Sequence, residues 1–130
     1  MENFVSDLLY KEESFRLIGL CMKIHSKLGK GFKEVVYKDA LEFEMKTNSI
    51  PYEREKSFSI FYGGITLPHR FDADFLVYES IILEIKAAYQ IHFDHLIQTL
   101  NYLKSSRVKL GILINFGGDK LVYKRVVCSN

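Results

Sequence analysis

Two acidic residues and one lysine interrupt apolar stretches near the middle of the chain. Asp74 lies in one apolar run, and Glu84 and Lys86 lie in the next. Side chains alternate between the two faces of a β-strand, so Glu84 and Lys86 share a face, as do Asp72 and Asp74. A charge inside a covered sheet requires a partner. Asp74 and Glu84 on adjacent strands could both bind a hard divalent cation, because such ions prefer carboxylate oxygens. Lys86 would then lie beside a water molecule bound to the cation.

The same three residues also fit a structural ion pair without catalytic function, formed by Lys86 with either Glu84 or Asp74. An aspartate followed after nine residues by Glu-x-Lys is a spacing that often arises by chance. The spacing alone therefore leaves a cation site and an ion pair equally open.

The apolar runs around these residues predict a β-hairpin. Residues 71–77 and 81–87 are strand-like and are separated by a polar turn at 78–80. The second run is apolar on both faces, which is typical of a central strand covered on both sides. A further strand is predicted at 52–62, and two glycines at 63–64 predict a turn into the strand that Ile65 begins. Three consecutive antiparallel strands are expected.

Helical periodicity predicts three helices, at about 13–28, 32–48 and 93–104. An apolar strand at 108–115 follows the third helix. Because it comes after a helical crossover, it should run parallel to its neighbour in the sheet. A last strand at 121–127 is predicted to close the sheet.

The second predicted helix carries a glutamate on its apolar side. The apolar arc consists of Phe32, Val36, Tyr37, Ala40, Leu41 and Met45. Glu34 falls inside this arc and should point to the interior or a cleft, where a carboxylate needs a partner or a metal ion. Lys38, Glu42 and Lys46 are predicted to lie on the opposite face.

The third predicted helix has two stripes. Its core face is predicted to consist of Phe93, Ile97, Leu100 and Leu103. His95, Gln98 and Tyr102 form a polar stripe that fits two positions equally well, one facing the acidic residues and one facing solvent. In the first helix, His25 lies beside an apolar stripe and either reaches the site or, as is commoner, packs as a hydrogen-bonded residue.

Composition narrows the protein class. With 130 residues, 48% of them hydrophobic and 26% charged, the chain is predicted to form one globular domain over residues 1–130. The net charge of +2 does not by itself indicate nucleic-acid binding, so any phosphate contacts must be local. Two basic clusters could provide them: Lys27, Lys30 and Lys33, and Lys104, Arg107 and Lys109.

Two observations bear on location. The two cysteines and the lack of a signal-peptide pattern favour a reduced, cytoplasmic setting. No apolar run reaches the roughly 18 residues that a membrane span needs, so we expect no membrane association.

Five sequence blocks occur in an order that resembles a known family. GFKEVVY contains Gly31, Glu34 and Tyr37 in the spacing G-x-x-E-x-x-Y, and DADFLV, ILEIKA, QTLNYL and GILINFG follow it. Over about residues 17–127 this combination resembles the GxxExxY protein family, a branch of the PD-(D/E)XK nuclease-like superfamily. The resemblance implies an α/β (α+β) fold, the restriction-endonuclease-like αβββαβ core, in which helices flank a mixed sheet.

The resemblance also implies roles for single residues. Asp74 matches the motif aspartate, and Glu84 and Lys86 match the acidic residue and the lysine of ExK. Glu34 resembles the additional acidic residue on the first core helix of many such nucleases. The residue before Asp74 is Ala73 where the superfamily name has proline.

A second set of matches concerns the substrate. Gln98 and Tyr102 match a Q-x-x-x-Y signature that helps to position substrate in exonuclease-like branches, and His25 is the third residue that we predict to do so. The implied activity is phosphodiester hydrolysis of nucleic acid, with DNA as the expected substrate. The implied cofactor is Mg²⁺ or Mn²⁺, which activates water and is held by Asp74, Glu84, the Ile85 carbonyl and Glu34.

Two alternatives keep the fold without the reaction. A catalytically inactive nuclease-fold module would bind nucleic acid or a protein partner, and an interaction domain would carry only an ion-pair network. In the nuclease interpretation, a homodimer is one way for so small a domain to span a duplex.

Overall fold

A five-stranded mixed β-sheet forms the middle layer of the protein, whose computed structural model describes residues 9–128. The elements in chain order are α2 (Lys11–Leu28), α3 (Glu34–Thr47), β1 (Tyr52–Tyr62), β2 (Ile65–Val77), β3 (Ile81–Lys86), α4 (Phe93–Ser106), β4 (Leu110–Asn115) and β5 (Val122–Val127). The strands follow one another in the sheet in chain order. Only the β3–β4 pair is parallel, as the crossover through α4 predicted.

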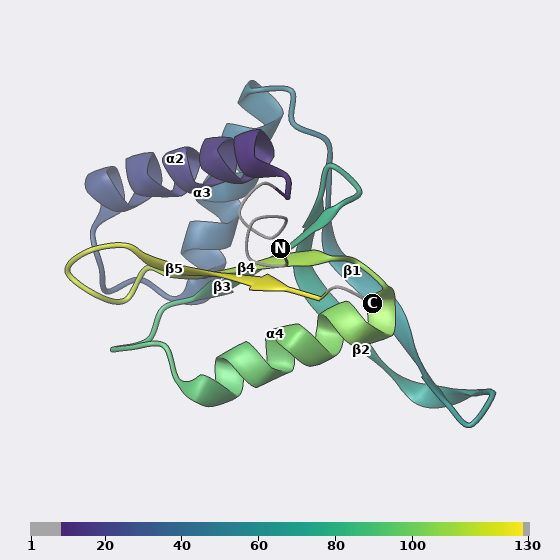
Figure 1. Cartoon of the computed structure of the whole chain (residues 1–130). Coiled ribbons are helices and arrows are strands. Elements are labelled where there is room, and N and C mark those ends of the chain that lie inside the picture. The colour runs from purple at the N-terminus through teal and green to yellow at the C-terminus, as the bar shows by residue number, and fades with distance from the viewer. Residues whose placement is uncertain (1–8, 129–130) are drawn as a thin grey trace.

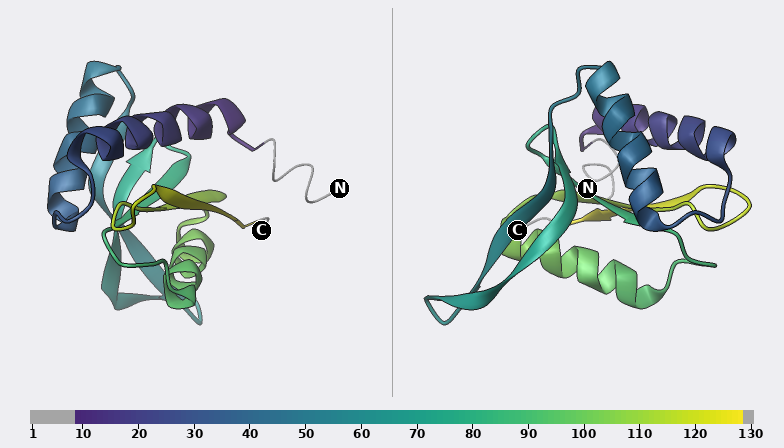
Figure 2. Two further views of the ribbon diagram at one scale, coloured as in Figure 1. Left: turned by 90° about the vertical axis from the view of Figure 1, so that its left-hand side faces the viewer. Right: turned by 180° about the vertical axis from the view of Figure 1, so that it is seen from behind.

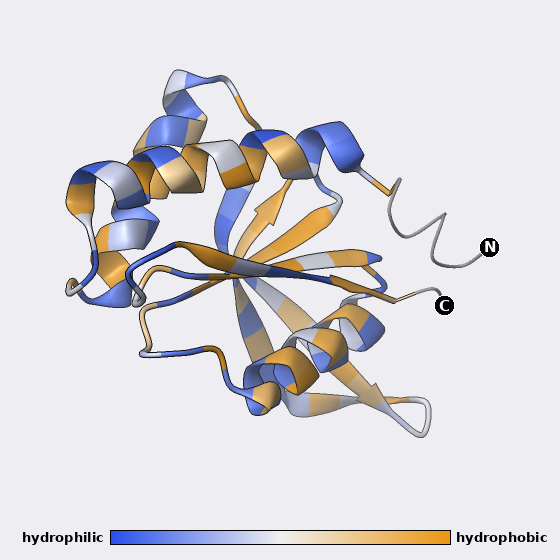
Figure 3. Ribbon diagram, turned by 60° about the vertical axis from the view of Figure 1, so that its left-hand side comes forward, coloured by the Kyte–Doolittle hydropathy of each residue, from blue (hydrophilic) through white to orange (hydrophobic). Residues whose placement is uncertain are grey.

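Helices cover both faces of this sheet. Figure 1 shows α2 and α3 on one face and α4 on the other, and the views in Figure 2 agree. Alternate residues of β3 pack into two separate cores: Leu83 contacts the side of α2 and α3, whereas Ile82 contacts the side of α4. Apolar residues dominate the central strands in Figure 3. The prediction of a central strand that is apolar on both faces is therefore confirmed.

The β1–β2 hairpin extends well beyond the rest of the sheet. β2 pairs with β1 along most of its length but with β3 only over Phe75–Val77. The remainder of the hairpin forms a two-stranded arm that projects past α4 (Figures 1 and 2). Its tip exposes three large apolar side chains, Phe61, Tyr62 and Ile65.

The predicted polar face of α3 is partly covered, which corrects the prediction. Lys38 is half-buried, with a side chain only 13% exposed. On the same face, Arg54 of β1 forms ion pairs with Asp39 and Glu42. The face of α3 that was predicted to be open to solvent is therefore partly covered by β1, through these polar contacts.

The core face predicted for α4 was also partly wrong. Phe93 and Ile97 are exposed, and the buried residues of the helix are Thr99 and Leu103. Gly111 of β4 explains the difference, because a Cβ there would lie 2.8 Å from Thr99 Cγ2. The missing side chain lets α4 approach β4 through Thr99, which turns Phe93 and Ile97 outward.

Two expectations from composition concern the cysteines and the membrane. Cys21 and Cys128 are both buried free thiols, and burial raises the pKa of Cys21 well above its ordinary value. Across residues 9–128, the helices are too short or too polar for any of them to cross a bilayer.

Candidate active site

Asp74 and Glu84 meet where β2 and β3 separate. The ladder between these strands ends at the pair Phe75 and Leu83, so the next residue of each strand lacks a partner in it. The Asp74 backbone N–H donates to Glu84 Oε2 at 2.8 Å, and the Ile85 backbone N–H donates to Asp74 Oδ2 at 2.7 Å. Each carboxylate thus accepts a hydrogen bond from the opposite strand, and the two lie side by side.

Strict alternation of side chains fails in β2 beside this point. Ala73 packs into the core on the α4 side and Phe75 into the core beneath α2 and α3. Asp72 is exposed, whereas Asp74 is half-buried. The neighbouring strand is distorted at the same level, since Glu55 of β1 has a φ of 54°. Alternation alone therefore could not place Asp72 and Asp74.

Glu84 is a carboxyl group in an unfavourable environment for charge. The residue is 5% exposed. Burial and then the neighbouring charge of Asp74 raise the pKa of Glu84 to about 8, while the Asp74 N–H, Lys86 and Lys38 act in the opposite direction. Such a carboxyl pair is stabilised by an added cation, so the donor chemistry of Asp74 and Glu84 fits a hard divalent ion.

Lys38 of α3 is a site residue that the sequence analysis missed. Its ammonium donates to Asp74 Oδ1 at 3.1 Å and also forms an ion pair with Glu55. Burial lowers the pKa of Lys38, but the interactions with Glu55 and Asp74 outweigh it and the pKa is raised. Helical spacing gave no signal for this role, because the carboxylates come from a distant hairpin.

Lys86 and His95 lie on the α4 side of the sheet near Glu84. Lys86 and Glu84 share a face of β3, as predicted, and the charge of Lys86 acts on both Glu84 and His95. Burial and then Lys86 lower the pKa of His95. The His92 backbone N–H donates to His95 Nδ1 at 3.2 Å, which leaves the hydrogen of the neutral ring on Nε2. His95 is therefore a neutral hydrogen-bond donor beside the lysine.

Glu34 lies at the edge of this group. It is exposed, and its Oε2 accepts a hydrogen bond of 3.3 Å from the Ala87 backbone N–H. With Lys33 and Ala87 it lines a wide, open depression, so the side chain lies at the surface and not in the interior. Within residues 9–128, however, no three His, Cys, Asp or Glu side chains gather closely enough to hold a metal ion. Glu34 therefore forms no such cluster with the two carboxylates.

The other two residues of G-x-x-E-x-x-Y fix the loop before Glu34. The buried Tyr37 hydroxyl donates to Gly29 O at 2.6 Å and accepts from the Phe32 N–H at 3.3 Å. The Tyr37 ring stacks on Phe116 at 4.5 Å. Gly31 has a φ of 112°, a conformation that side chains rarely adopt. The motif therefore sets where α3 begins and so where Glu34 stands.

A clamp from β4, also missed from sequence, holds the chain after Lys86. The Phe116 N–H donates to Lys86 O at 2.8 Å. The Asn115 side chain accepts from the Ala88 N–H and donates to Ala88 O, both at 2.9 Å. A Cβ on Gly117 would lie 2.1 Å from Ala88 O, so only glycine fits. These contacts fix the backbone between Lys86 and the loop that leads to α4.

Of the three predicted substrate-positioning residues, Tyr102 is influenced by the charges of the carboxylates. It stacks on Phe71 at 4.1 Å, and burial, then the charges of Glu84 and the two aspartates, raise its pKa. Gln98 is exposed one turn earlier on α4. His25 contacts another region: its Nε2 lies 3.0 Å from Gly118 O and its ring packs near Phe116.

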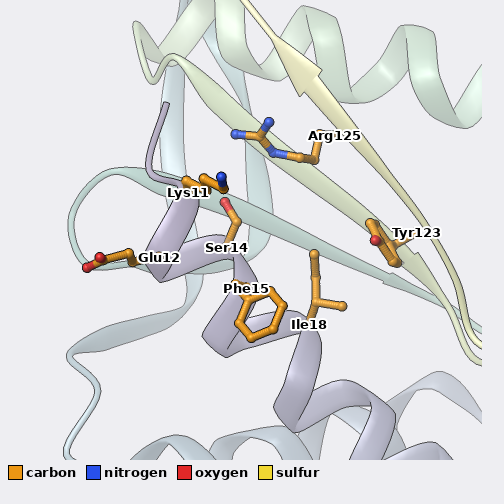
Figure 4. A pocket seen from close by; sticks show the side chains of 7 residues that line it. All are labelled: Lys11, Glu12, Ser14, Phe15, Ile18, Tyr123 and Arg125. Carbon is orange, nitrogen blue, oxygen red and sulfur yellow. The ribbon is translucent and has the colours of Figure 1, made fainter. Parts of the chain in front are cut away.

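A separate cavity of about 510 Å³ lies between the start of α2 and β5 (Figure 4). Its lining residues are Lys11, Glu12, Ser14, Phe15, Ile18, Tyr123 and Arg125. None of the predicted site residues is among them, so this cavity is distinct from the candidate site.

Comparison with known proteins places this geometry in a family. In the crystal structure of SSO0001, a similar fold is found at 23% sequence identity with a TM-score of 0.59; the match covers 92% of this chain and 60% of that one. A search of the curated proteins gave no match. Residues 11–126 match the PD-(D/E)XK nuclease superfamily. The order of helices and strands is the expected restriction-endonuclease-like arrangement, and the chain belongs to the PD-(D/E)XK nuclease superfamily.

Proposed function

We propose that the protein is a divalent-cation-dependent nuclease that hydrolyses phosphodiester bonds in DNA. One observation carries this proposal: the carboxylates of Asp74 and Glu84 interlock at the divergence of β2 and β3, with Lys86 on the same face as Glu84. Superfamily membership supports the reaction class.

Each residue of the site has its own role in the proposed hydrolysis. Asp74 and Glu84 offer oxygens to the cation, and Glu34, which accepts the Ala87 N–H just after β3, would contribute through water. When bound, a Mg²⁺ or Mn²⁺ ion would neutralise charge on the phosphate and lower the pKa of water. Lys86 would orient the attacking water or stabilise the negative charge that develops on the phosphate.

Two side chains of α4 supply neutral hydrogen-bond donors. His95 presents Nε2–H, and its lowered pKa keeps the ring neutral near Lys86. Tyr102 also carries a protonated hydroxyl, because burial and the charge of Glu84 raise its pKa above its already high ordinary value. A donor that carries no charge can bind a phosphate oxygen without competing with the cation for the carboxylates. We assign both residues to substrate positioning.

A groove between the arm and the end of α4 supports nucleic acid as the substrate. This cavity of about 440 Å³ is lined by Lys56, Ser57, Phe58, Ser59, Phe61, Ser105, Ser106 and Arg107. The lining is basic, aromatic and hydroxylic, which suits phosphates and bases. Lys56 pairs in register with Ala73, the neighbour of Asp74 in β2, and its ammonium also forms an ion pair with Glu53 at 3.4 Å. Exposed Lys104 and Lys109 lie at the same end of α4.

Within the superfamily, we infer that the chain belongs to the GxxExxY branch. The support is structural: Gly31, Glu34 and Tyr37 each have a distinct role at the start of α3.

A cleavage assay with matched variants tests the proposed activity. Purified Glu84→Gln and Lys86→Ala proteins should lose Mg²⁺- or Mn²⁺-dependent cleavage of single-stranded, duplex and branched DNA and RNA while remaining folded. Glu79→Gln, an exposed change in the turn of the same hairpin, should leave cleavage unchanged. Cleavage that persists in both site variants would refute the assignment. Binding without cleavage by the wild-type protein would favour an inactive module.

A further inference from the structure

The ammonium of Lys38 already places a positive charge against Asp74. Its ammonium donates to Asp74 Oδ1 at 3.1 Å, and the other oxygen, Oδ2, accepts the Ile85 N–H at 2.7 Å. Both oxygens of Asp74 therefore have a partner within the chain. The Lys38 and Asp74 side chains are 13% and 18% exposed, so this ion pair is largely shielded from solvent.

Lys38 has a second acidic partner that lies outside the carboxylate pair. Glu55 of β1 forms an ion pair with the same ammonium, and its side chain is 50% exposed. Its φ of 54° is unusual within a strand. The register pairs Arg54 with Phe75 and Lys56 with Ala73 but leaves out the residues between them, Glu55 and Asp74. The backbone distortion thus stands directly opposite Asp74, where strain often marks a functional site.

A divalent ion at Asp74 and Glu84 would conflict with this ammonium. An ammonium and a divalent ion that both contact Asp74 are like charges at short range, so each weakens the binding of the other. Lys38 need not lose its ion pairing when it leaves Asp74, because Glu55 already contacts it. The side chain therefore has a second acidic partner already in place.

We propose that Lys38 is an internal counter-ion that holds Asp74 in the cation-free protein and moves fully to Glu55 when a divalent ion binds at Asp74 and Glu84. The proposal rests on the proposed function, since it requires that site to take up a cation. Lys38 competes with the ion, and Glu55 weakens that competition. Lys38 is thus a positioning residue that sets the cation affinity of the site.

Two substitutions should change the affinity in opposite directions. Lys38→Met removes the competitor and should tighten Mn²⁺ binding by about tenfold. Glu55→Gln removes the alternative partner, keeps Lys38 at Asp74 and should weaken binding by a similar factor. The double variant should bind like Lys38→Met alone, because Glu55 acts only through Lys38. A purely structural ion-pair network predicts no gain in any variant.

Isothermal titration of Mn²⁺ into the chelator-treated 130-residue protein measures these affinities, and circular dichroism checks that each variant is folded. Lys46→Met on the exposed face of α3 is the matched control and should not change the affinity. Should Lys38→Met fail to fold, the weaker binding expected of Glu55→Gln still tests the proposal.

The outcomes separate this inference from the proposed function. Mn²⁺ uptake by the wild-type protein with no gain in Lys38→Met overturns the counter-ion role and leaves the cation site intact. An unchanged or higher affinity in Glu55→Gln also overturns it. No uptake by either the wild-type protein or Lys38→Met overturns both the counter-ion role and the proposed cation site.

Discussion

Replacing Glu84 with glutamine should make the cation-free protein more stable at alkaline pH. Glutamine has nearly the same shape, and its carbonyl can still accept the Asp74 N–H that Glu84 Oε2 accepts at 2.8 Å. The substitution removes the ionised carboxylate from a residue that is 5% exposed and lies beside another carboxylate. The variant therefore isolates the cost of charge at this position.

The magnitude follows from the raised pKa. The folded protein keeps a proton on Glu84 between pH 4.5 and about 8, a range in which the unfolded chain has released it. The free energy of unfolding of the wild-type protein therefore falls as pH rises through this window. One pKa unit corresponds to about 1.4 kcal/mol, which sets an upper limit of about 5 kcal/mol. Water entry and structural relaxation reduce this, so we expect about 2 kcal/mol.

Urea unfolding followed by circular dichroism, with chelator present, gives the free energies at about pH 5 and about pH 9. Wild type and Glu84→Gln should be nearly equal at the lower pH, and the variant should be the more stable protein at the higher pH. Glu44→Gln is the control. Glu44 is similarly buried, but it pairs with Lys23 at 3.0 Å, so its replacement should bring no such gain. A Glu84→Gln protein no more stable than wild type at about pH 9 would refute the reasoning.

Three further predictions concern the framework and the groove. Tyr37→Phe should lower the free energy of unfolding by about 1–3 kcal/mol and reduce cleavage, because the hydroxyl that holds Gly29 and Phe32 is lost. The control is Tyr62→Phe at an exposed position, and equal effects of the two changes would contradict the role of Tyr37. Gly117→Ala should destabilise the protein by about 3 kcal/mol or more, measured by urea unfolding, because the added Cβ would overlap Ala88. Gly19→Ala on the open surface of α2 is the control and should be neutral or stabilising. A Gly117→Ala protein as stable as wild type would refute the clamp. The double variant Lys56→Ala, Arg107→Ala should bind DNA more weakly in the presence of chelator, and the slope of log affinity against log salt should fall by about 2, measured by fluorescence anisotropy. The double variant Lys11→Ala, Lys46→Ala is the control. An unchanged slope would exclude the groove as a phosphate-binding site.

The fold could be predicted from sequence because its signals are local. Alternation and the two glycines at 63–64 placed a strand at 52–62, where β1 is found. The run at 81–87 is apolar on both faces, which predicted that β3 is central. The crossover through α4 predicted the parallel pairing of β3 with β4.

The site could be predicted only in part. Asp74, Glu84 and Lys86 were identifiable because a charge in an apolar strand is locally conspicuous. Lys38 and Asn115 gave no such signal, since a lysine on a polar helix face and an asparagine at a strand end are ordinary. Their partners, Asp74 and Ala88, lie 36 and 27 residues away. Their roles depend on how distant elements pack.

The core face of α4 was mispredicted at Phe93 and Ile97, although Leu103 is buried as predicted, and the reason is similar. Periodicity ranks the faces of a helix by their hydrophobicity, and it favoured Phe93 and Ile97. The buried face was decided instead by Gly111 on a strand that follows the helix. Sequence patterns within one helix cannot report the absence of a side chain on its neighbour.

Titration of a divalent cation into the wild-type protein and into Asp74→Asn and Glu84→Gln tests the central claim most directly. The adjacent carboxylates predict uptake of Mg²⁺ or Mn²⁺ by the wild-type chain and loss of that uptake in either variant. Uptake that is the same in all three proteins, or absent from the wild type, would contradict a cation site formed by Asp74 and Glu84.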